Sequence, residues 1–306
     1  MKGVRGMLLP VPTVFLEDGS VDDGLMRELT EYYIEAGVQA LFVAGSFGQG
    51  PAMNTVERMH VAELVISQAN KRLPVIIHVG TADPYTTMEL GRHALAKGAD
   101  GLGLVGPYYY SDRTPKELRL HYQLVAGELG APILLYNNPP YSGYTIGPKL
   151  MAELVGDSPN IFGAKLAMGS VDEARMYLEY LGADFKLFSL ASALFPGMAA
   201  GIAGTVSPPL AVFPEIGVEL VRAIDDRDNA RALEVQEAVI AFHSAFLSRA
   251  VRDECGRAIY GAALKELGFA VKKYPRWPTG EVTEERRAWL AELFRKARTV
   301  LDRKAA

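Results

Sequence analysis

The chain has 306 residues, of which 49% are hydrophobic and 22% are charged. This length suits either one large α/β barrel or two ordinary domains. The formal net charge is only −4 and the basic residues are scattered, which argues against a nucleic-acid or membrane-surface partner and favours a small-molecule substrate. Cys255 is the only cysteine, so an intrachain disulfide is excluded. With no signal-peptide pattern and no apolar run of membrane-spanning length, we expect a soluble, cytoplasmic protein.

One type of helix-to-strand connection, called a join below, recurs along the chain. A helical pattern ends at small residues, usually with a glycine, and a short apolar strand follows. Together with the segments between the joins, this pattern predicts eight strands, at residues 6–11, 41–44, 75–79, 101–104, 133–136, 161–165, 187–190 and 205–207. Helical patterns lie between them, for example at residues 22–36, 55–71, 86–97, 115–129 and 171–181.

Eight strands alternating with helices predict an α/β fold, a (β/α)₈ TIM barrel formed by residues 1–225. A doubly wound open sheet is the alternative. From residue 226 onwards the pattern is helical only, with helices expected at 229–247, 255–267 and 283–301. Residues 226–306 therefore form a predicted all-helical C-terminal extension that packs against the barrel.

Two possible cofactor signals lack the context that they need. Residues 101–106 satisfy G-x-G-x-x-G, but they lie within a predicted strand and continue to Pro107 instead of entering a helix. The five histidines show no metal-ligand spacing, and Cys255 is isolated. We therefore expect neither a dinucleotide nor a metal as cofactor.

Lys165 is the only cation in the otherwise apolar or small run at residues 160–168. A buried ammonium group is costly, so a buried lysine tends to lose its proton and to become a nucleophile that forms Schiff bases with carbonyl compounds. The alternative is a lysine at a strand end whose ammonium group reaches water.

Other predicted strand ends carry groups that could act together with the Lys165 amine. Active sites of parallel barrels lie at the C-terminal ends of the strands, and Tyr136 ends the strand next to that of Lys165. The second strand leads into a glycine-rich turn at residues 45–51, whose backbone amides could hold a carboxylate. An amine, a phenol that transfers protons and a carboxylate-binding turn are the parts of a Schiff-base lyase acting on a 2-oxo acid, and that chemistry requires no metal.

Several motifs resemble those of the class I pyruvate aldolases and lyases related to dihydrodipicolinate synthase and N-acetylneuraminate lyase. The resemblance extends over nearly the whole chain, and the order and spacing of the motifs make it specific. The corresponding stretches are Gly45-Ser46-Phe47-Gly48-Gln49 for G-T-T-G-E, Pro107-Tyr108-Tyr109 for P-Y-Y, Tyr136-Asn137-Asn138-Pro139 for Y-N-x-P, Gly163-Ala164-Lys165 for G-x-K and Gly204-Thr205-Val206-Ser207 for G-V-I-S.

The resemblance implies roles for individual residues. Lys165 would form the Schiff base and Tyr136 would act as acid and base. Ser46 and Tyr109 would complete a proton relay, with the Tyr109 phenol reaching the site of a neighbouring subunit in a tetramer. The substrate-binding residues would be Gly45, Phe47, Val206, Ser189 and Tyr141. A homotetramer or homodimer is expected.

Departures from the motifs bear on the substrate. Dihydrodipicolinate synthases carry an arginine where this chain has Tyr141, which argues against lysine biosynthesis because a phenol cannot make the same ionic contact. Residues 48–53 resemble the G-x-G-P-A-L stretch of 2-keto-3-deoxygluconate aldolases, which favours a 3-deoxy-2-oxo sugar acid. An aryl or other apolar aldehyde against Phe47 remains open.

The leading hypothesis is thus an aldolase or lyase that cleaves a 2-oxo acid to pyruvate and an aldehyde, or catalyses the reverse reaction. The alternatives are a dehydratase using the same Schiff base, a dihydrodipicolinate synthase-like condensation, and a non-catalytic protein that binds 2-oxo acids.

Overall fold

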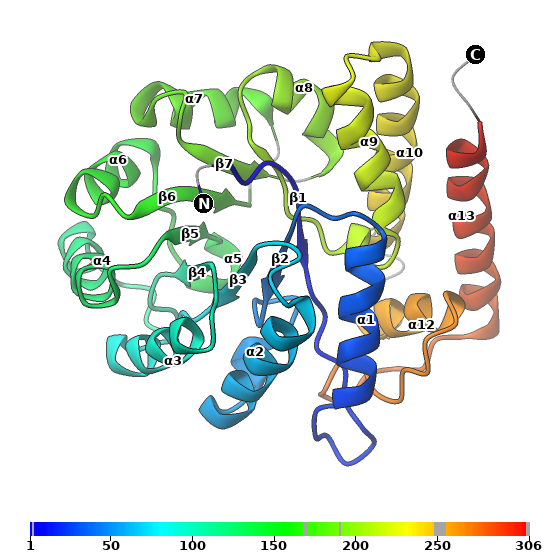
Figure 1. Ribbon diagram of the computed structural model, residues 1–306, viewed down its shortest axis with the longest axis horizontal. Coiled ribbons are helices and arrows are strands. Elements are labelled where there is room, and N and C mark those ends of the chain that lie inside the picture. Colours follow the sequence, from blue (N-terminus) through cyan, green and yellow to red (C-terminus); the bar gives the residue numbers. More distant parts are fainter. Residues whose placement is uncertain (2, 168–169, 190, 248–254, 304–306) are drawn as a thin grey trace.

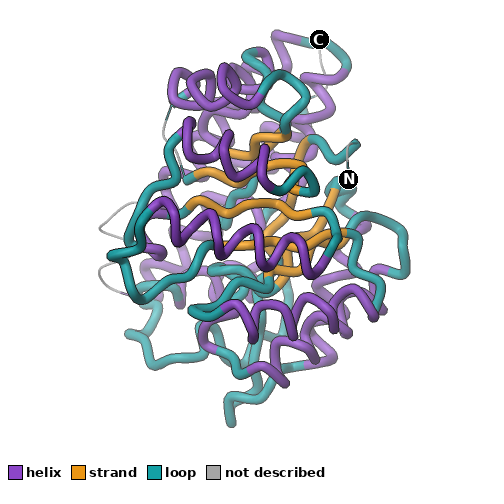
Figure 2. The backbone as a smooth tube through the Cα atoms, turned by 90° about the vertical axis from the view of Figure 1, so that its left-hand side faces the viewer, coloured by secondary structure: helices purple, strands orange, loops and turns teal. Residues whose placement is uncertain are grey.

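Eight parallel strands form a closed barrel in the order β1 to β8, surrounded by helices (Figures 1 and 2). The computed structural model describes residues 1, 3–167, 170–189, 191–247 and 255–303. The predicted (β/α)₈ barrel is confirmed, and the open-sheet alternative is wrong because β1 pairs with β8. The strands are β1 Gly6–Pro10, β2 Ala40–Val43, β3 Val75–His78, β4 Gly101–Val105, β5 Ile133–Asn137, β6 Ile161–Leu166, β7 Lys186–Ser189 and β8 Gly204–Thr205.

Several helices begin at a residue whose side chain caps their first turn. Thr114 caps α4 and exchanges hydrogen bonds with Glu117, and Thr283 caps α13. The helices are α1 Asp23–Glu35, α2 Thr55–Ala69, α3 Pro84–Ala96, α4 Pro115–Leu129, α5 Pro139–Ser142, α6 Pro148–Asp157, α7 Val171–Leu181, α8 Leu194–Ala199, α9 Pro214–Asp225, α10 Asn229–Leu247, α12 Ala258–Glu266 and α13 Glu284–Asp302.

The predicted joins between helix and strand have the expected backbone. Gly37 and Gly98 follow α1 and α3 with φ of +81° and +98°, a conformation that a side chain disfavours. In both cases the next strand begins three residues later. These glycines therefore end their helices and turn the chain back into the barrel.

The eighth strand is shorter than predicted. It comprises only Gly204–Thr205, whereas residues 205–207 were expected. The amide of Val206 still donates to the carbonyl oxygen of Ser189, but Pro208 and Pro209 come soon after, and proline lacks the amide that extends a ladder. A Cβ atom at residue 204 would lie 1.8 Å from the carbonyl oxygen of Gly6, so glycine allows β8 to close on β1. Leu190, the predicted end of the seventh strand, lies outside the described residues.

Aromatic side chains fill the centre of the barrel. Phe42 is fully buried, and a Cβ atom at residue 103 would lie 2.5 Å from its ring. Gly103 of β4 thus leaves space for a ring from β2. Phe42 packs in one interior cluster with Leu134, Tyr136 and Phe188.

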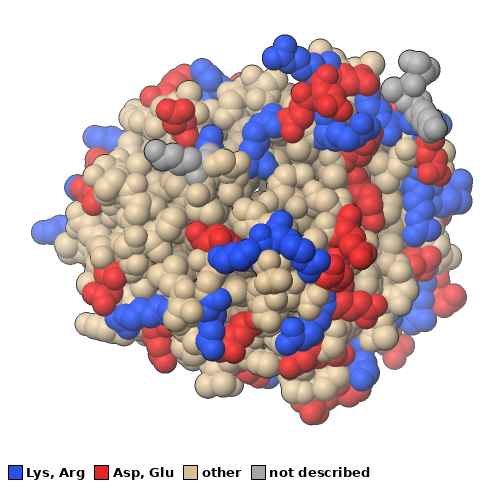
Figure 3. Space-filling view, viewed as in Figure 1, with Lys and Arg blue, Asp and Glu red and all other residues tan. Residues whose placement is uncertain are grey.

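Charges are mixed on the surface. Positive and negative side chains are interspersed over the face shown in Figure 3. No helix among the described residues combines the length and the apolar character needed to cross a lipid bilayer.

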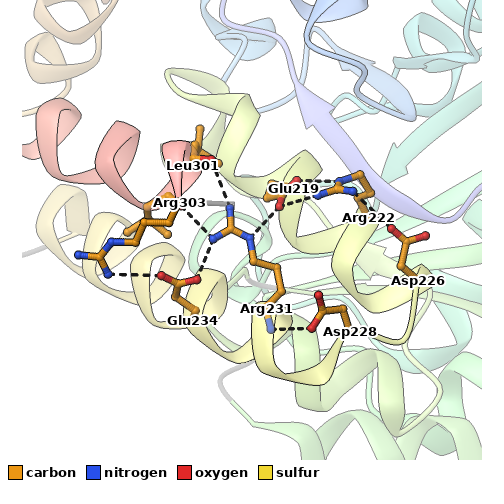
Figure 4. Close-up of polar contacts among 9 residues, drawn as sticks. Glu219, Arg222, Asp226, Asp228, Arg231, Glu234, Leu301 and Arg303 are labelled. Carbon is orange, nitrogen blue, oxygen red and sulfur yellow. Dashed lines mark hydrogen bonds and ion pairs between the residues drawn. The ribbon is translucent and has the colours of Figure 1, made fainter. Parts of the chain in front are cut away.

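A buried arginine joins the C-terminal helices to the barrel (Figure 4). The predicted boundary after residue 225 falls between α9 and α10. Arg231 of α10 is 6% exposed and lies 2.9 Å from Glu219 of α9 and 2.7 Å from Glu234. It also donates to the carbonyl oxygen of Val300 in α13 at 2.9 Å. One guanidinium group therefore connects α9, α10 and α13.

Replacing Arg231 by alanine should lower the free energy of unfolding by about 2–4 kcal/mol, because Glu219 and Glu234 lose a buried partner and the carbonyl oxygen of Val300 loses this donor. Denaturant-induced unfolding measures the change. The control is Arg303→Ala, which removes a cation that is 65% exposed and lies 3.4 Å from Glu234. That variant should change stability by less than about 0.5 kcal/mol, and equal losses in both variants would contradict the assignment.

Candidate active site

Lys165 and Tyr136 lie side by side at the C-terminal end of the barrel. They are paired residues of the neighbouring strands β6 and β5. The Lys165 Nζ atom lies 4.1 Å from the centre of the Tyr136 ring and 5.0 Å from that of Phe42. Lys165 is half-buried, and its side chain lines a pocket together with Tyr136. Its amine is thus held over two aromatic rings at the barrel mouth.

The hydroxyl group of Tyr136 lies in an environment that favours its ionised form. Burial alone would raise its pKa, but the Lys165 charge and hydrogen bonds with Ser46, Asn138 and Lys165 outweigh burial and lower the pKa below 10.0. The Asn138 side-chain amide donates to this hydroxyl oxygen. A phenol with a lowered pKa is a more effective proton acceptor near neutral pH.

His78, at the end of β3, supports this arrangement from below. It is 2% exposed, and its ring centre lies 6.0 Å from that of Tyr136 and 5.8 Å from that of Phe42. Burial, with the charges of Arg58 and Lys165, lowers its pKa well below the ordinary value. A neutral imidazole therefore packs beneath the site.

The turn after β2 contributes two residues with free backbone amides to the pocket lining. Ser46 and Phe47 line the pocket, and no hydrogen bond within the described residues uses their N–H groups. The turn is tight, because a Cβ atom at residue 50 would lie 1.9 Å from the carbonyl oxygen of Ala44. Two adjacent amides without partners can hold a carboxylate.

Residues of the C-terminal segment hold this turn from outside. Tyr274 donates its hydroxyl hydrogen to the carbonyl oxygen of Phe47 at 3.1 Å, and the N–H group of Arg276 donates to the Gln49 side chain at 2.7 Å. The Phe47 ring is 6% exposed and lies 4.9 Å from the ring of Tyr260, measured between centres. Phe47 and Gln49, which depart from the family motif, thus contact the C-terminal segment.

The pocket has a volume of about 190 Å³ and brings most predicted site residues together. Six of them line it, namely Ser46, Phe47, Tyr136, Tyr141, Lys165 and Val206. Three do not. Gly45 and Ser189 are buried but do not line the pocket, and the Ser189 carbonyl oxygen accepts a hydrogen bond from Thr205 of β8. Tyr109 is 83% exposed, with φ of +80°.

Other residues at the site had no signal that singled them out in the sequence. Phe42 looked like one more apolar residue of a strand, and Asn138 occupies the variable position of its motif. The C-terminal segment contributes three residues to the pocket lining, namely His243, Arg257 and Tyr260. The strand-and-helix pattern that predicts the barrel does not extend to this segment. Only the tertiary fold brings these three to the mouth of the barrel.

Comparisons with known proteins agree with this geometry. Residues 3–297 match the model of the dihydrodipicolinate synthetase family. A probable 2-dehydro-3-deoxy-D-pentonate aldolase, YjhH, of Escherichia coli K12 is 30% identical over 93% of this chain and 94% of its own. A 4-hydroxy-tetrahydrodipicolinate synthase of Methanopyrus kandleri is 31% identical over 96% of each chain.

The solved structures include YagE of E. coli K12, a prophage protein of the dihydrodipicolinic acid synthase family in complex with pyruvate. It superimposes with a TM-score of 0.88 at 27% identity, over 96% of this chain and 98% of its own. The motifs, the barrel and the match over nearly the full length lead to one conclusion. The chain belongs to the dihydrodipicolinate synthetase family and is a Schiff-base-forming lyase.

Proposed function

We propose that the protein is a class I aldolase that cleaves a 3-deoxy-2-oxo sugar acid to pyruvate and an aldehyde, or forms the acid from them. The observation that carries this proposal is the Lys165 amine beside the Tyr136 phenol, with the amides of Ser46 and Phe47 in the same pocket. The 30% identity with the probable pentonate aldolase supports the choice of substrate class.

The reaction begins at the amine. The substrate carboxylate accepts hydrogen bonds from the N–H groups of Ser46 and Phe47, which brings C2 to Lys165 Nζ. The neutral amine adds to the C2 carbonyl, and loss of water gives a positively charged iminium ion. Because the iminium withdraws electrons, it prepares the bond between C3 and C4 for cleavage.

Tyr136 transfers the protons. Its ionised phenol takes the proton of the C4 hydroxyl group, the C3–C4 bond breaks, and its electron pair moves into the iminium to form an enamine. The aldehyde then leaves. Protonation of the enamine at C3 restores an iminium, and water releases pyruvate and regenerates the Lys165 amine.

Three alternatives use the same pocket differently. A dehydratase would expel water from the iminium and release no pyruvate, whereas a synthase-like condensation would join pyruvate to a semialdehyde. A binding protein would form no imine. Family membership favours the lyases over the binding protein. A cytoplasmic location, suggested by the single cysteine, remains a prediction.

Incubation with pyruvate and borohydride should add a reduced pyruvyl group to Lys165, detectable by peptide mass spectrometry. Lys165→Arg should abolish the adduct, because an arginine side chain stays protonated and does not form an imine under these conditions. Release of free pyruvate from a 3-deoxy-2-oxo sugar acid then distinguishes cleavage from dehydration. A wild-type protein that remains unmodified would refute the proposal.

Ser46→Ala should raise the pKa of Tyr136, since it removes a hydrogen bond that favours the phenolate. The limb of the pH profile of kcat that rises as Tyr136 ionises should move to higher pH. Nuclear magnetic resonance with ¹³Cζ-labelled tyrosine measures this pKa directly, and Tyr136→Phe identifies the signal. Ser46→Thr, which retains a hydroxyl group, is the control. An unchanged Tyr136 pKa in Ser46→Ala would contradict the relay.

Tyr109 is 83% exposed, and its left-handed backbone is rare for a bulky residue, which supports a role for its phenol at a subunit interface. Light scattering should therefore give two or four times the chain mass of 33.3 kDa. Tyr109→Phe should lower kcat about tenfold or more if the phenol relays protons. A fully active monomer would exclude this role.

A further inference from the structure

Arg257 reaches the mouth of the pocket from the segment before α12. Its Nη1 atom donates to the carbonyl oxygen of Ser46 at 2.8 Å, and its Nη2 atom donates to the hydroxyl oxygen of Tyr141 at 2.5 Å. The guanidinium carbon lies 5.6 Å from the centre of the Trp277 ring. A guanidinium group has five N–H donors, so these contacts orient the group and leave donors for a ligand.

Among the described residues, no acidic side chain pairs with Arg257. Its two hydrogen-bond acceptors in that part of the chain are neutral oxygen atoms, and none of the described residues that line the pocket is Asp or Glu. Lys165 is a second basic residue in the same small space. The proposed function assigns the pyruvyl carboxylate to the N–H groups of Ser46 and Phe47 beside Lys165. The guanidinium group of Arg257, with Tyr141, is then available to complement a second anion.

His243 of α10 provides an independent sign of a ligand. It lines the pocket and is 4% exposed, and its Nε2 atom has no hydrogen-bond partner within the part of the chain that the structure describes. Burial lowers its pKa, which favours a neutral imidazole. A buried nitrogen without a partner is costly, and a polar group of the substrate would satisfy it.

We infer that Arg257 and His243 form a distal subsite, and that the aldehyde half of the preferred substrate ends in a carboxylate that Arg257 binds. This inference rests on the proposed function and specifies its substrate class as a dicarboxylic 2-oxo acid. The tyrosine at position 141 then does not prevent carboxylate recognition. It helps to position an arginine that comes from another part of the chain.

A purely structural role for Arg257 predicts a different result. If the guanidinium group only fixed the β2 turn through Ser46, its loss would impair all substrates alike. If it binds the distal carboxylate, its loss would affect charged aldehydes selectively, and mainly through KM. Two aldehydes that differ only in this charge separate the two roles.

The test measures condensation with pyruvate, using succinate semialdehyde and its uncharged methyl ester as probes. For wild-type protein, kcat/KM should be at least about tenfold higher for the acid than for the ester, as a charge-assisted hydrogen bond provides. In Arg257→Gln this ratio should fall close to one, through a higher KM for the acid. In Arg257→Lys, which keeps the positive charge but lacks the planar guanidinium group, the ratio should lie between those of wild-type protein and Arg257→Gln.

Arg295→Gln is the matched control, because it removes an arginine side chain that is 66% exposed on α13 and should keep the wild-type ratio. Borohydride trapping of pyruvate on wild-type protein is measured first, so a failure of the proposed function is seen separately. If the imine forms but the acid is not preferred, or if both Arg257 variants keep the wild-type ratio, the distal subsite is refuted.

Discussion

The site depends on an irregularity in the pairing of β5 with β6. Ile133 pairs with Ile161, but the next residue, Leu134, pairs with Gly163, so Phe162 is an extra residue in β6. Successive residues of a strand point to opposite faces, and a shift of one residue would exchange the faces. Without the extra residue Ala164 would lie opposite Tyr136. The bulge brings Lys165 there instead, with its side chain towards the barrel mouth.

Glycine makes this bulge possible. A Cβ atom at residue 163 would lie 2.4 Å from the carbonyl oxygen of Lys186 on β7, so a side chain would push the strands apart. The glycine two residues before the lysine, seen in the sequence as part of a short motif, thus has a mechanical role. It lets β6 approach β7 closely while Phe162 is accommodated, and the pairing of Lys165 with Tyr136 follows from that approach.

The sequence was sufficient for the barrel but not for the whole pocket. Glycines at the ends of helices and the apolar strands that follow them are local signals. They predicted the strand order and the position of Lys165 and Tyr136 at neighbouring strand ends. Arg257, His243 and Tyr260 could not be predicted as neighbours of Ser46, because their contacts join segments about two hundred residues apart and leave no local periodicity. A role for Ser189 stays a prediction. Its position at a strand end was clear from the sequence, whereas the hydrogen bond of its carbonyl oxygen with Thr205 of β8 is seen only in the structure.

The electrostatics of the pair suit every stage of the proposed reaction. The charge of Lys165 helps to lower the pKa of Tyr136, against the opposing effect of burial. An iminium ion carries its positive charge at the same nitrogen as the ammonium group. The support for the phenolate is therefore retained when the Schiff base forms, which is when Tyr136 must accept a proton. When the enamine neutralises that nitrogen, the pKa of the Tyr136 phenol rises and the phenol holds its proton. Protonation of the enamine at C3 restores the iminium charge, which again stabilises the phenolate left behind.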